Sequence, residues 1–318
     1  MKTLFHTNTL NFRGTTVAVQ DYAKFNQEIL GNESVICYNA SIGYEKDMGS
    51  EQSVVDELSK MYDVRPYDTY EELETITSDV DFAYFIRGGQ QEPTPTNTKT
   101  GIHAVFGFDD PHGDRYAYVS EWLSKEASGG KHPFVPHMVD LPKPTGDFRE
   151  ALGLNSDDIV IGRIGGYYTF DLPWVYSAIT SVVEKNPKVK FLFVGTYPFI
   201  DHPNVRFINE FSSRQKKSNF INTCDAMIHG RSRGETFGLS IVEGLALDRP
   251  VFAWENGAEL NHRVVLGGDN SNLLYNESNL VEKLLNVKKY NESGEYSALV
   301  KDYLPEPVMK KFKEVYYD

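Results

Sequence analysis

Two carboxylates with a spacing suited to a long polar ligand stand in the last third of the chain. Glu235 and Glu243 flank the seven-residue stretch TFGLSIV, which is typical of a helix that begins near Phe237. A strand-like run, DAMIH, precedes them. In α/β sheets, ligands bind at the carboxyl ends of strands, and a helix that begins there offers unpaired N–H groups to an anion. Eight residues of helix rise roughly 12 Å, so the two carboxylates could bind opposite ends of a sugar–diphosphate–ribose ligand.

A simpler interpretation exists for an isolated pair of glutamates. Glu235 would be a solvated residue favoured by the helix dipole, and Glu243 would be an unrelated surface residue. Gly238 argues for the functional interpretation, because a glycine lets a phosphate approach the backbone closely. The residues around the pair decide between the two.

The segment GETFGLSIVEGLALDRPVFAW, residues 234–254, resembles the signature of the family 4 retaining glycosyltransferases, which have the GT-B fold. The shared features are the spacing of the glutamates, the Phe-Gly-Leu between them and the RPV that begins the next strand. IGRIGG at 161–166 is similar to the family's Gly-Arg turn, and PEPVMKKFKEVYYD is similar to its terminal helix. The resemblance covers the whole chain loosely and residues 158–254 well. RIGGYYTFD and CDAMIHGRSRGETFG look most like a branch found in virus-encoded and bacterial surface-glycan enzymes.

The resemblance implies a role for each matching residue. Glu235 would contact hydroxyls of the donor sugar, and Glu243 would contact the ribose. Arg163 would neutralise the leaving diphosphate, since a guanidinium binds phosphate oxygens bidentately; the alternative for it is a surface salt bridge. Catalytic roles would thus fall to Arg163 and Glu235, with His103 as a third candidate. The implied substrate-binding positions are Gly14, Thr15, Gly165, Tyr168, Arg231, Thr236, Phe237, Gly238, Leu239 and Glu243.

One position departs from the family pattern. The family usually has a lysine five residues after this arginine, where this chain has Tyr168. Arg231 or Arg233 could replace the missing cation, or the tyrosine hydroxyl could donate to a phosphate oxygen. The remaining alternative is a catalytically weak or dead chain.

The first half of the chain supplies fewer candidates. NFRGTT resembles the family's glycine loop over the donor phosphates, which singles out Gly14 and Thr15. His103 follows a strand, where the family often has a histidine near the transferred sugar. A lone histidine is more often structural, so both interpretations of it are open. Arg87, at the end of YFIRGG, is a further cleft candidate.

Three patterns imitate other sites. Asp79-Val80-Asp81 has the form of an Asp-x-Asp metal motif, but it precedes its apolar strand instead of following one, which indicates a turn. FDDPHGD at 108–114 clusters acidic residues in a loop without a recognisable metal-site spacing. GRIGG lacks the third glycine and the later acid of a dinucleotide fingerprint. No metal site is therefore predicted.

Composition limits the possible partners. The chain has 318 residues and a net charge of −13, which argues against nucleic acid because phosphate backbones need a basic face. Cys37 and Cys224 lie in apolar runs and are expected to be buried free thiols in a reducing compartment. No apolar run approaches the 18 residues of a transmembrane segment. These features predict a cytoplasmic protein.

Strand-like runs alternate with amphipathic segments along the chain, which predicts an α/β fold with parallel sheets covered by helices on both faces. The stretch PHMVDLPKPTGDFREALGLNSDD is rich in proline, glycine and charge and indicates a domain boundary. By the resemblance the architecture is GT-B, with two Rossmann-like domains facing across a cleft. The predicted domains are 1–142 on the acceptor side, 143–304 for the nucleotide sugar, and a helix at 305–318 that returns to the first domain.

These observations predict an enzyme, a retaining glycosyltransferase that needs no metal or other cofactor. Its donor would be a nucleotide sugar, UDP- or GDP-linked, and its acceptor a glycan or glycoconjugate. Two alternatives stay open. One is a nucleotide-sugar epimerase on the same fold, which would act on the donor alone. The other is a non-catalytic sugar-nucleotide or glycan binder, which the tyrosine at position 168 makes conceivable.

Overall fold

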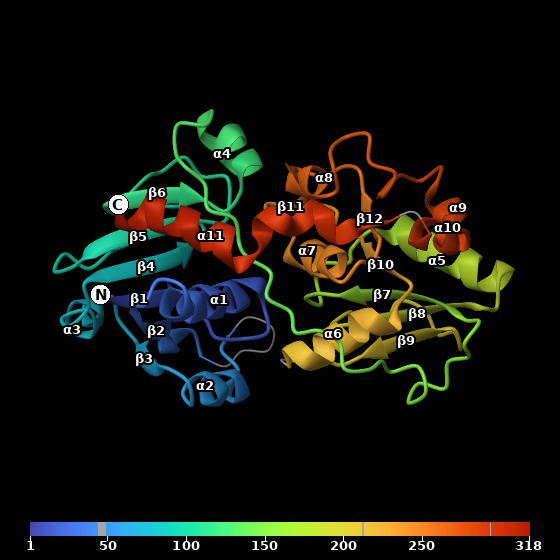
Figure 1. Cartoon of the computed structure of the whole chain (residues 1–318), viewed down its shortest axis with the longest axis horizontal. Helices are drawn as coiled ribbons and strands as arrows, with labels where there is room; N and C mark the ends of the chain where they lie inside the picture. The colour runs from blue at the N-terminus through green and yellow to red at the C-terminus, as the bar shows by residue number, and fades with distance from the viewer. Residues whose placement is uncertain (44–48, 212, 293) are drawn as a thin grey trace. The chain divides into compact units, whose positions relative to one another are not determined.

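The structure, a computed structural model, describes residues 1–43, 49–211, 213–292 and 294–318 (Figure 1). The chain divides into two compact units. The first contains Met1–Asp140 together with Tyr303–Asp318, and the second contains Leu141–Asp302. The sequence predicts the breaks after residues 142 and 304. Because the first unit contains both Met1 and Asp318, both ends of the chain belong to it.

The first unit is built on a six-stranded sheet in the order β3-β2-β1-β4-β5-β6, in which all neighbouring strands are parallel. Its strands are β1 (Lys2–Thr7), β2 (Glu33–Asn39), β3 (Asp63–Tyr67), β4 (Phe82–Arg87), β5 (Lys99–Ala104) and β6 (Arg115–Tyr118). Its helices are α1 (Gly14–Glu28), α2 (Gln52–Leu58), α3 (Glu72–Ile76), α4 (Glu121–Ser128) and α11 (Pro305–Phe312), with short turns of other helix types at Ala40–Ile42 and Lys313–Tyr317.

The second unit repeats this plan. Its sheet has the order β14-β12-β10-β7-β8-β9 and is also parallel throughout. Its strands are β7 (Ile159–Ile164), β8 (Val189–Val194), β9 (Val205–Ile208), β10 (Ala226–His229), β12 (Val251–Trp254) and β14 (Leu274–Tyr275), and a small pair is formed by β11 (Gly234–Glu235) and β13 (Glu259–Leu260). Its helices are α5 (Pro173–Lys185), α6 (Arg214–Thr223), α7 (Leu239–Ala246), α8 (Asn261–Val265), α9 (Leu280–Leu285) and α10 (Val287–Asn291), followed by a 3-10 segment at Tyr296–Tyr303.

Counted from its own first strand, each sheet has the doubly wound order 3-2-1-4-5-6 of a Rossmann domain. The predicted α/β fold class with two parallel sheets is thus confirmed. The sequence accounts for it locally: VKFLFV of β8 is almost continuously apolar, as a strand covered on both faces must be. α5 begins at Pro173, whose fixed φ suits a first helical turn, and it buries one face through Val175, Ile179 and Val182.

The C-terminal segment is part of the first unit's core. α11 buries Val308, Met309 and Phe312, and the Phe312 ring lies 5.0 Å from the ring of Tyr22 in α1. In Figure 1 the red α11 ribbon runs beside the blue α1 over this sheet. Burial of large aromatic rings is a strong stabilising contribution, so this segment is an integral part of the unit.

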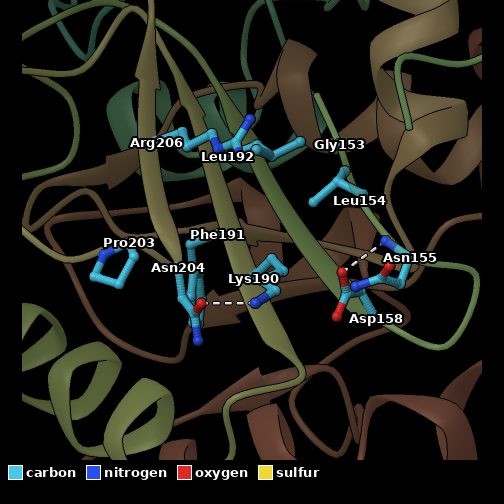
Figure 2. Close-up of a pocket in the computed structure, with 10 residues that line it drawn as sticks. All are labelled: Gly153, Leu154, Asn155, Asp158, Lys190, Phe191, Leu192, Pro203, Asn204 and Arg206. Atoms are coloured by element: carbon cyan, nitrogen blue, oxygen red, sulfur yellow. Dashed lines mark hydrogen bonds between the residues drawn. The ribbon is translucent and has the colours of Figure 1, made fainter. Parts of the chain in front are cut away.

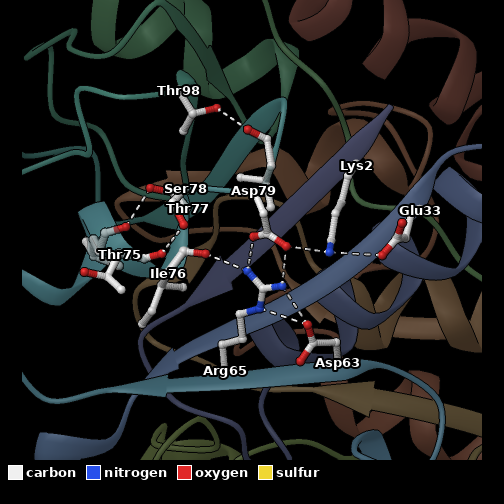
Figure 3. A network of polar contacts seen from close by, with 12 residues as sticks. Lys2, Glu33, Asp63, Arg65, Thr75, Ile76, Thr77, Ser78, Asp79 and Thr98 are labelled. Atoms are coloured by element: carbon white, nitrogen blue, oxygen red, sulfur yellow. Dashed lines mark hydrogen bonds and ion pairs between the residues drawn. The ribbon is translucent and has the colours of Figure 1, made fainter.

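β3 was missed in the sequence, and its composition explains why. The strand DVRPY carries a proline and half-exposed polar residues, which normally argue against a strand. It lies at the edge of the sheet, where a missing N–H is tolerated. The Arg65 side chain ties it to the turn before β4 by an ion pair with Asp79 at 2.6 Å, and it also pairs with Asp63 of the same strand at 2.7 Å (Figure 3).

The same contacts explain the Asp79-Val80-Asp81 pattern. Asp79 also pairs with Lys2 at 2.7 Å (Figure 3). Asp81 accepts a hydrogen bond from the Lys2 backbone N–H at 2.7 Å. The bonds from Arg65 and then Lys2 hold the pKa of Asp79 well below its usual range. The pattern is therefore a turn whose carboxylates fasten neighbouring strands, as its position before the strand predicted.

His103 of β5 is wholly buried in the first unit. Its Nε2 donates to the carbonyl of Val135 at 2.8 Å, and its Nδ1 accepts from the hydroxyl of Tyr84. Both ring nitrogens are occupied by protein groups, so the structure favours the structural alternative over a role beside the transferred sugar. None of the described helices is both long enough and apolar enough to span a bilayer.

This environment predicts an acid-sensitive contribution to stability. Burial lowers the pKa of His103 from its ordinary value of 6.5 to about 4. The stabilisation of the neutral ring is complete above about pH 6.5 and is lost as the pH falls toward 4, because the unfolded chain takes up the proton first. At pH 5 the loss should be on the order of 2 kcal/mol.

Urea unfolding at pH 7.5 and pH 5.0 tests this in wild type and His103→Gln, since glutamine can still donate to Val135 and accept from Tyr84. The drop in the free energy of unfolding between the two pH values should be smaller in His103→Gln. His132→Gln, at a partly exposed position of the same unit, is the control and should drop as wild type does. An equal drop in His103→Gln and wild type would contradict the assignment.

Candidate active site

The centre of the second sheet is where the fold itself predicts a ligand. β7 and β10 are neighbours there, paired in parallel with Ala226 opposite Ile161 and Met227 opposite Gly162. The chain leaves these two strands toward opposite halves of the sheet, and the crevice outside their carboxyl ends is the general binding position in doubly wound folds. Arg163 stands near the end of β7 and His229 at the end of β10.

Glu235 lies in this crevice region and is held from two sides. Its Oε1 accepts from Nε2 of His229 at 2.9 Å, and its Oε2 accepts from Nη1 of Arg231 at 3.1 Å. Burial alone would raise the pKa of Glu235, but the hydrogen bond from His229 and the charge of the Arg231 guanidinium outweigh this effect and hold the pKa below its ordinary value. The carboxylate is 19% exposed and ionised at neutral pH. It precedes α7 in the short strand β11, so it is not a solvated residue of a first helical turn.

His229 was not among the residues predicted from the sequence. It is buried, and its carbonyl accepts from the Tyr275 hydroxyl at 2.7 Å, which anchors the end of β10. A usable signal was present, because a histidine that ends a strand next to a predicted ligand loop is a candidate by position alone. Lys217 was also not predicted from the sequence.

The start of α7 has the shape that a close ligand approach needs. Gly238 stands immediately before the helix with φ +96°, a conformation that residues with a side chain rarely adopt. As a glycine, this N-cap residue has no side chain that could cap the helix end. Thr236 and Phe237 are buried, and the Phe237 carbonyl accepts from Asn261 at 2.8 Å, while Leu239 is half-buried. Backbone N–H groups of this turn could therefore face an anion.

Glu243 is not a surface residue. It lies on α7 and is buried, and its Oε1 accepts from Nζ of Lys217 in α6 at 2.7 Å. Nothing in the sequence connects positions so far apart, so the contact could be found only in the folded chain.

Arg163 is buried as well, only 4% exposed, and it does not form a surface salt bridge. Burial lowers its pKa to about 10, which leaves it charged at neutral pH. Its two terminal nitrogens donate to groups of two loops, those that follow β7 and β8. These acceptors are the carbonyls of Gly166, Val194 and Gly195 and the hydroxyls of Thr169 and Thr196, at 2.6 to 3.2 Å.

The Arg163 guanidinium, which the sequence predicts to bind a diphosphate, thus bonds to groups of the protein itself. Gly165 serves the same arrangement, because a Cβ there would come within 2.6 Å of Nη2 of Arg163. The loops that Arg163 joins also carry two exposed tyrosines. Tyr168 is 63% exposed, and its hydroxyl lies 3.2 Å from that of Tyr197.

The two arginines considered as replacement cations differ in position. Arg231 is partly buried and directly on Glu235. Arg233 is 56% exposed and donates through Nε to Glu259 at 2.7 Å, on the small β11–β13 pair. Arg231 is accordingly the cation that the structure brings beside the predicted catalytic carboxylate.

The remaining predicted residues belong to the first unit. Gly14, which is exposed, and Thr15, which is half-buried, begin α1 after the β1 loop. Arg87 is buried, with its guanidinium 4.4 Å from the Phe85 ring, and it donates to the carbonyls of Glu92 and Pro93. Arg87 therefore fastens the chain that follows β4.

Among the described residues, neither a group of metal-ligating side chains nor the small pocket of the second unit offers an alternative to this site. In the part of the chain that the structure describes, no three His, Cys, Asp or Glu side chains are placed to hold a metal. Asp110 and Asp114 accept from different backbone N–H groups, those of Gln91 and Thr100. A pocket of about 80 Å³ lies at the opposite edge of the second sheet, where β7, β8 and β9 begin (Figure 2). Its polar groups bond to one another, as Lys190 does to Asn204 at 2.6 Å.

A comparison with protein families matches the part of the chain that contains this site. The family model described as glycosyl transferases group 1 matches residues 158–288, the stretch that contains Arg163, Lys217, Glu235 and Glu243. HepE of Anabaena, solved in complex with UDP-glucose, is similar with a TM-score of 0.71 and 12% identity, over 99% of this chain and 98% of that one. No curated protein matches the chain.

Two further solved structures have a similar fold. WaaG, a glycosyltransferase involved in lipopolysaccharide biosynthesis, has a TM-score of 0.66 and 10% identity over 99% of both chains. A putative UDP-N-acetylglucosamine 2-epimerase from Listeria monocytogenes has a TM-score of 0.62 and 12% identity over 97% of this chain and 94% of that one.

The fold is GT-B, as in these glycosyltransferase structures. The group 1 glycosyltransferase model matches residues 158–288 of the second unit, so the resemblance predicted from the glutamate-containing segment is confirmed over that stretch. The family match supports glycosyl transfer as the activity.

The bonds of Arg163 predict a structural consequence. Arg163→Met removes a guanidinium that satisfies carbonyls and hydroxyls in two loops, and those groups lose their donor in a buried place. The free energy of unfolding should fall by about 3 kcal/mol or more, because each unsatisfied buried group costs about 1–3 kcal/mol. Chemical unfolding of the variant measures this.

Arg206→Met is the matched control, because that side chain is exposed and bonds to a carbonyl near the surface, that of Leu152, so its loss should cost less than about 1 kcal/mol. If Arg163→Met proved as mild as the control, the guanidinium would not be joining the two loops.

Proposed function

We propose that the chain is a retaining, metal-independent glycosyltransferase that moves a sugar from a nucleoside-diphosphate donor to a glycan or glycoconjugate. The observation that carries the proposal is the ionised Glu235, held between His229 and Arg231 directly before the uncapped start of α7. The family match over residues 158–288 supports the same activity. In this proposal the second unit binds the donor and the first unit serves the acceptor.

The donor would lie along α7. Glu235 would accept hydrogen bonds from hydroxyls of the transferred sugar, and Glu243 would accept from the ribose. The diphosphate between them would meet the backbone N–H groups at Gly238 and Leu239, where the helix dipole favours negative charge. A UDP-sugar is the first choice of donor, since HepE, a structure similar to this one, was solved with UDP-glucose.

Catalysis would come from charge stabilisation of the leaving group. The bond between the sugar and the diphosphate breaks, and the departing phosphate oxygen gains negative charge in the transition state. Arg231 is the nearest cation to Glu235, and the charged, buried Arg163 adds a fixed positive potential from behind the loop after β7. The Tyr168 hydroxyl, exposed in that loop, would donate to a phosphate oxygen in place of the family's lysine.

We place the reaction in the cytoplasm, because Cys37 and Cys224 are both buried free thiols. No metal takes part in the proposed mechanism, in which cationic side chains and backbone dipoles meet the diphosphate charge.

Transfer is tested by incubating the protein with UDP-glucose or GDP-mannose and a panel of oligosaccharide acceptors, with and without EDTA. We expect release of the nucleoside diphosphate and a glycosylated product whose new bond keeps the donor's anomeric configuration, as read by NMR. EDTA should leave the rate unchanged. Loss of activity in EDTA that manganese restores would refute metal independence, and an inverted product would refute retention.

The same experiment separates the alternatives. An epimerase would convert the donor sugar without any acceptor. A binding protein would bind the nucleotide, which a thermal-shift assay would detect, and would turn over no donor; ligand at 100 times its dissociation constant should add about 2.7 kcal/mol.

The two glutamates should differ in their effects when changed to the isosteric amide. Glu235→Gln should leave the affinity for UDP nearly intact and reduce transfer heavily, because Glu235 faces the sugar. Glu243→Gln should weaken UDP and UDP-glucose by a similar factor, because Glu243 faces the ribose. Hydrogen bonds to a charged group are worth roughly 1.5–3 kcal/mol, so each loss should be tenfold or more.

Titration calorimetry with UDP, paired with the transfer assay, measures both effects. Glu184→Gln gives a carboxylate control, because Glu184 is exposed near the end of α5, which leads back to the amino end of β8 and away from the carboxyl ends of the strands. Loss of UDP binding in Glu235→Gln would place Glu235 on the nucleotide and not on the sugar.

A further inference from the structure

Lys217 and Glu243 form a buried ion pair between two helices. Nζ of Lys217 on α6 lies 2.7 Å from Oε1 of Glu243 on α7, and the side chains are only 15% and 5% exposed. Of the two carboxylates assigned to the donor, Glu235 is held by His229 and Arg231, and Glu243 is held by this lysine.

The pair accounts for the burial of Glu243. A carboxylate removed from water is strongly disfavoured unless a cation or hydrogen bonds compensate it, and loss of one partner of a buried pair leaves an uncompensated charge. Lys217 also orients the group, because its ammonium bonds to one oxygen, Oε1. An ionised carboxylate has a second oxygen that can accept further hydrogen bonds.

We infer that Lys217 is a positioning residue that pairs with Glu243 and turns it so that its second oxygen receives the ribose hydroxyls of the donor. This inference rests on the proposed function, and it makes Lys217 a determinant of selectivity for ribose over deoxyribose. Lys217 acts through Glu243 and does not itself touch the ligand.

The charge arrangement distinguishes this role from that of a second phosphate cation. A lysine bound at 2.7 Å to a carboxylate has its charge balanced by that partner, so the pair as a whole exerts little net attraction on a diphosphate. Removal of Lys217 should consequently alter the recognition of the 2′-hydroxyl and leave the contribution of the phosphates almost unchanged.

The test is titration calorimetry with UDP, 2′-deoxy-UDP and UMP, on wild type, Lys217→Met and Lys217→Arg. Wild type should prefer UDP over 2′-deoxy-UDP about tenfold, as expected for a hydrogen bond to a charged group. Lys217→Met should reduce this preference to below about threefold, while the ratio of UDP to UMP affinity stays as in wild type. Lys217→Arg keeps a cation on Glu243 and should retain most of the preference.

Two further variants keep the result interpretable. Lys216→Met, at the exposed neighbouring position of α6, should behave as wild type. The double variant Lys217→Met with Glu243→Gln removes both charges, so no buried carboxylate is left unpaired if the single variant folds poorly. Its ribose preference should equal that of Glu243→Gln alone, because the lysine acts only through the glutamate.

Three results with the variants would overturn the inference. One is an unchanged ribose preference in folded Lys217→Met, and another is a further loss of preference from Glu243→Gln to the double variant. The third is a selective loss of UDP relative to UMP affinity, which would make Lys217 a phosphate cation. Wild-type binding of UDP without any ribose preference would overturn the inference and leave the proposed function standing. Failure of wild type to bind UDP, GDP or their sugars would overturn the proposed function and the inference with it.

Discussion

The parallel pairing of β7 with β10 is the constraint on which the site depends. Two parallel strands cannot be joined directly, so each must continue through a crossover, and here the crossovers leave toward opposite halves of the sheet. The two loops therefore diverge at the carboxyl ends and leave a crevice between them. Arg163 enters it from one strand, and His229, with the Glu235 loop behind it, enters from the other. The small β11–β13 pair then fixes where Glu235 stands relative to His229.

Polar groups in this region are buried, and each of the main charges has a partner. Glu235 is shared by His229 and Arg231, while Glu243 is bound by Lys217. Arg163 is satisfied by carbonyls and threonine hydroxyls. A charged group that is buried without a partner is strongly disfavoured. Such pairing compensates the buried charges and fixes the orientation of the side chains before any ligand arrives, which is the preorganisation that a binding site for hydroxyls and phosphates requires.

The departure at Tyr168 has a structural counterpart. In this chain the buried arginine of β7 bonds to the loops after β7 and β8, and the exposed tyrosine stands where the family pattern has a lysine. The cations that remain near the glutamates, Arg231 and Lys217, come from other elements, the loop after β10 and helix α6. The proposed donor site thus has the carboxylate spacing of the family pattern, while its cations come from different elements.

Much of the fold could be predicted from the sequence because it is written in local patterns. Apolar runs such as VKFLFV, the proline at the start of α5 and the alternation of strands with helices depend on neighbours a few residues away. β3 is an exception to this local predictability. The sequence DVRPY is typical of a loop, and it forms a strand because the edge of a sheet tolerates its proline.

For the candidate site, the sequence by itself determined the two glutamates, the glycine before α7 and the arginine of β7, since their spacing lies within short segments. Only the tertiary structure decided what holds them. His103 could be assigned to the core once both of its ring nitrogens were seen to bond to protein groups. Lys217 meets Glu243, and Arg163 meets the loop after β8, through contacts between distant parts of the chain. Such contacts follow from the order in which strands pair and helices pack, and burial then forces each charge to find a partner, which no spacing along the chain expresses.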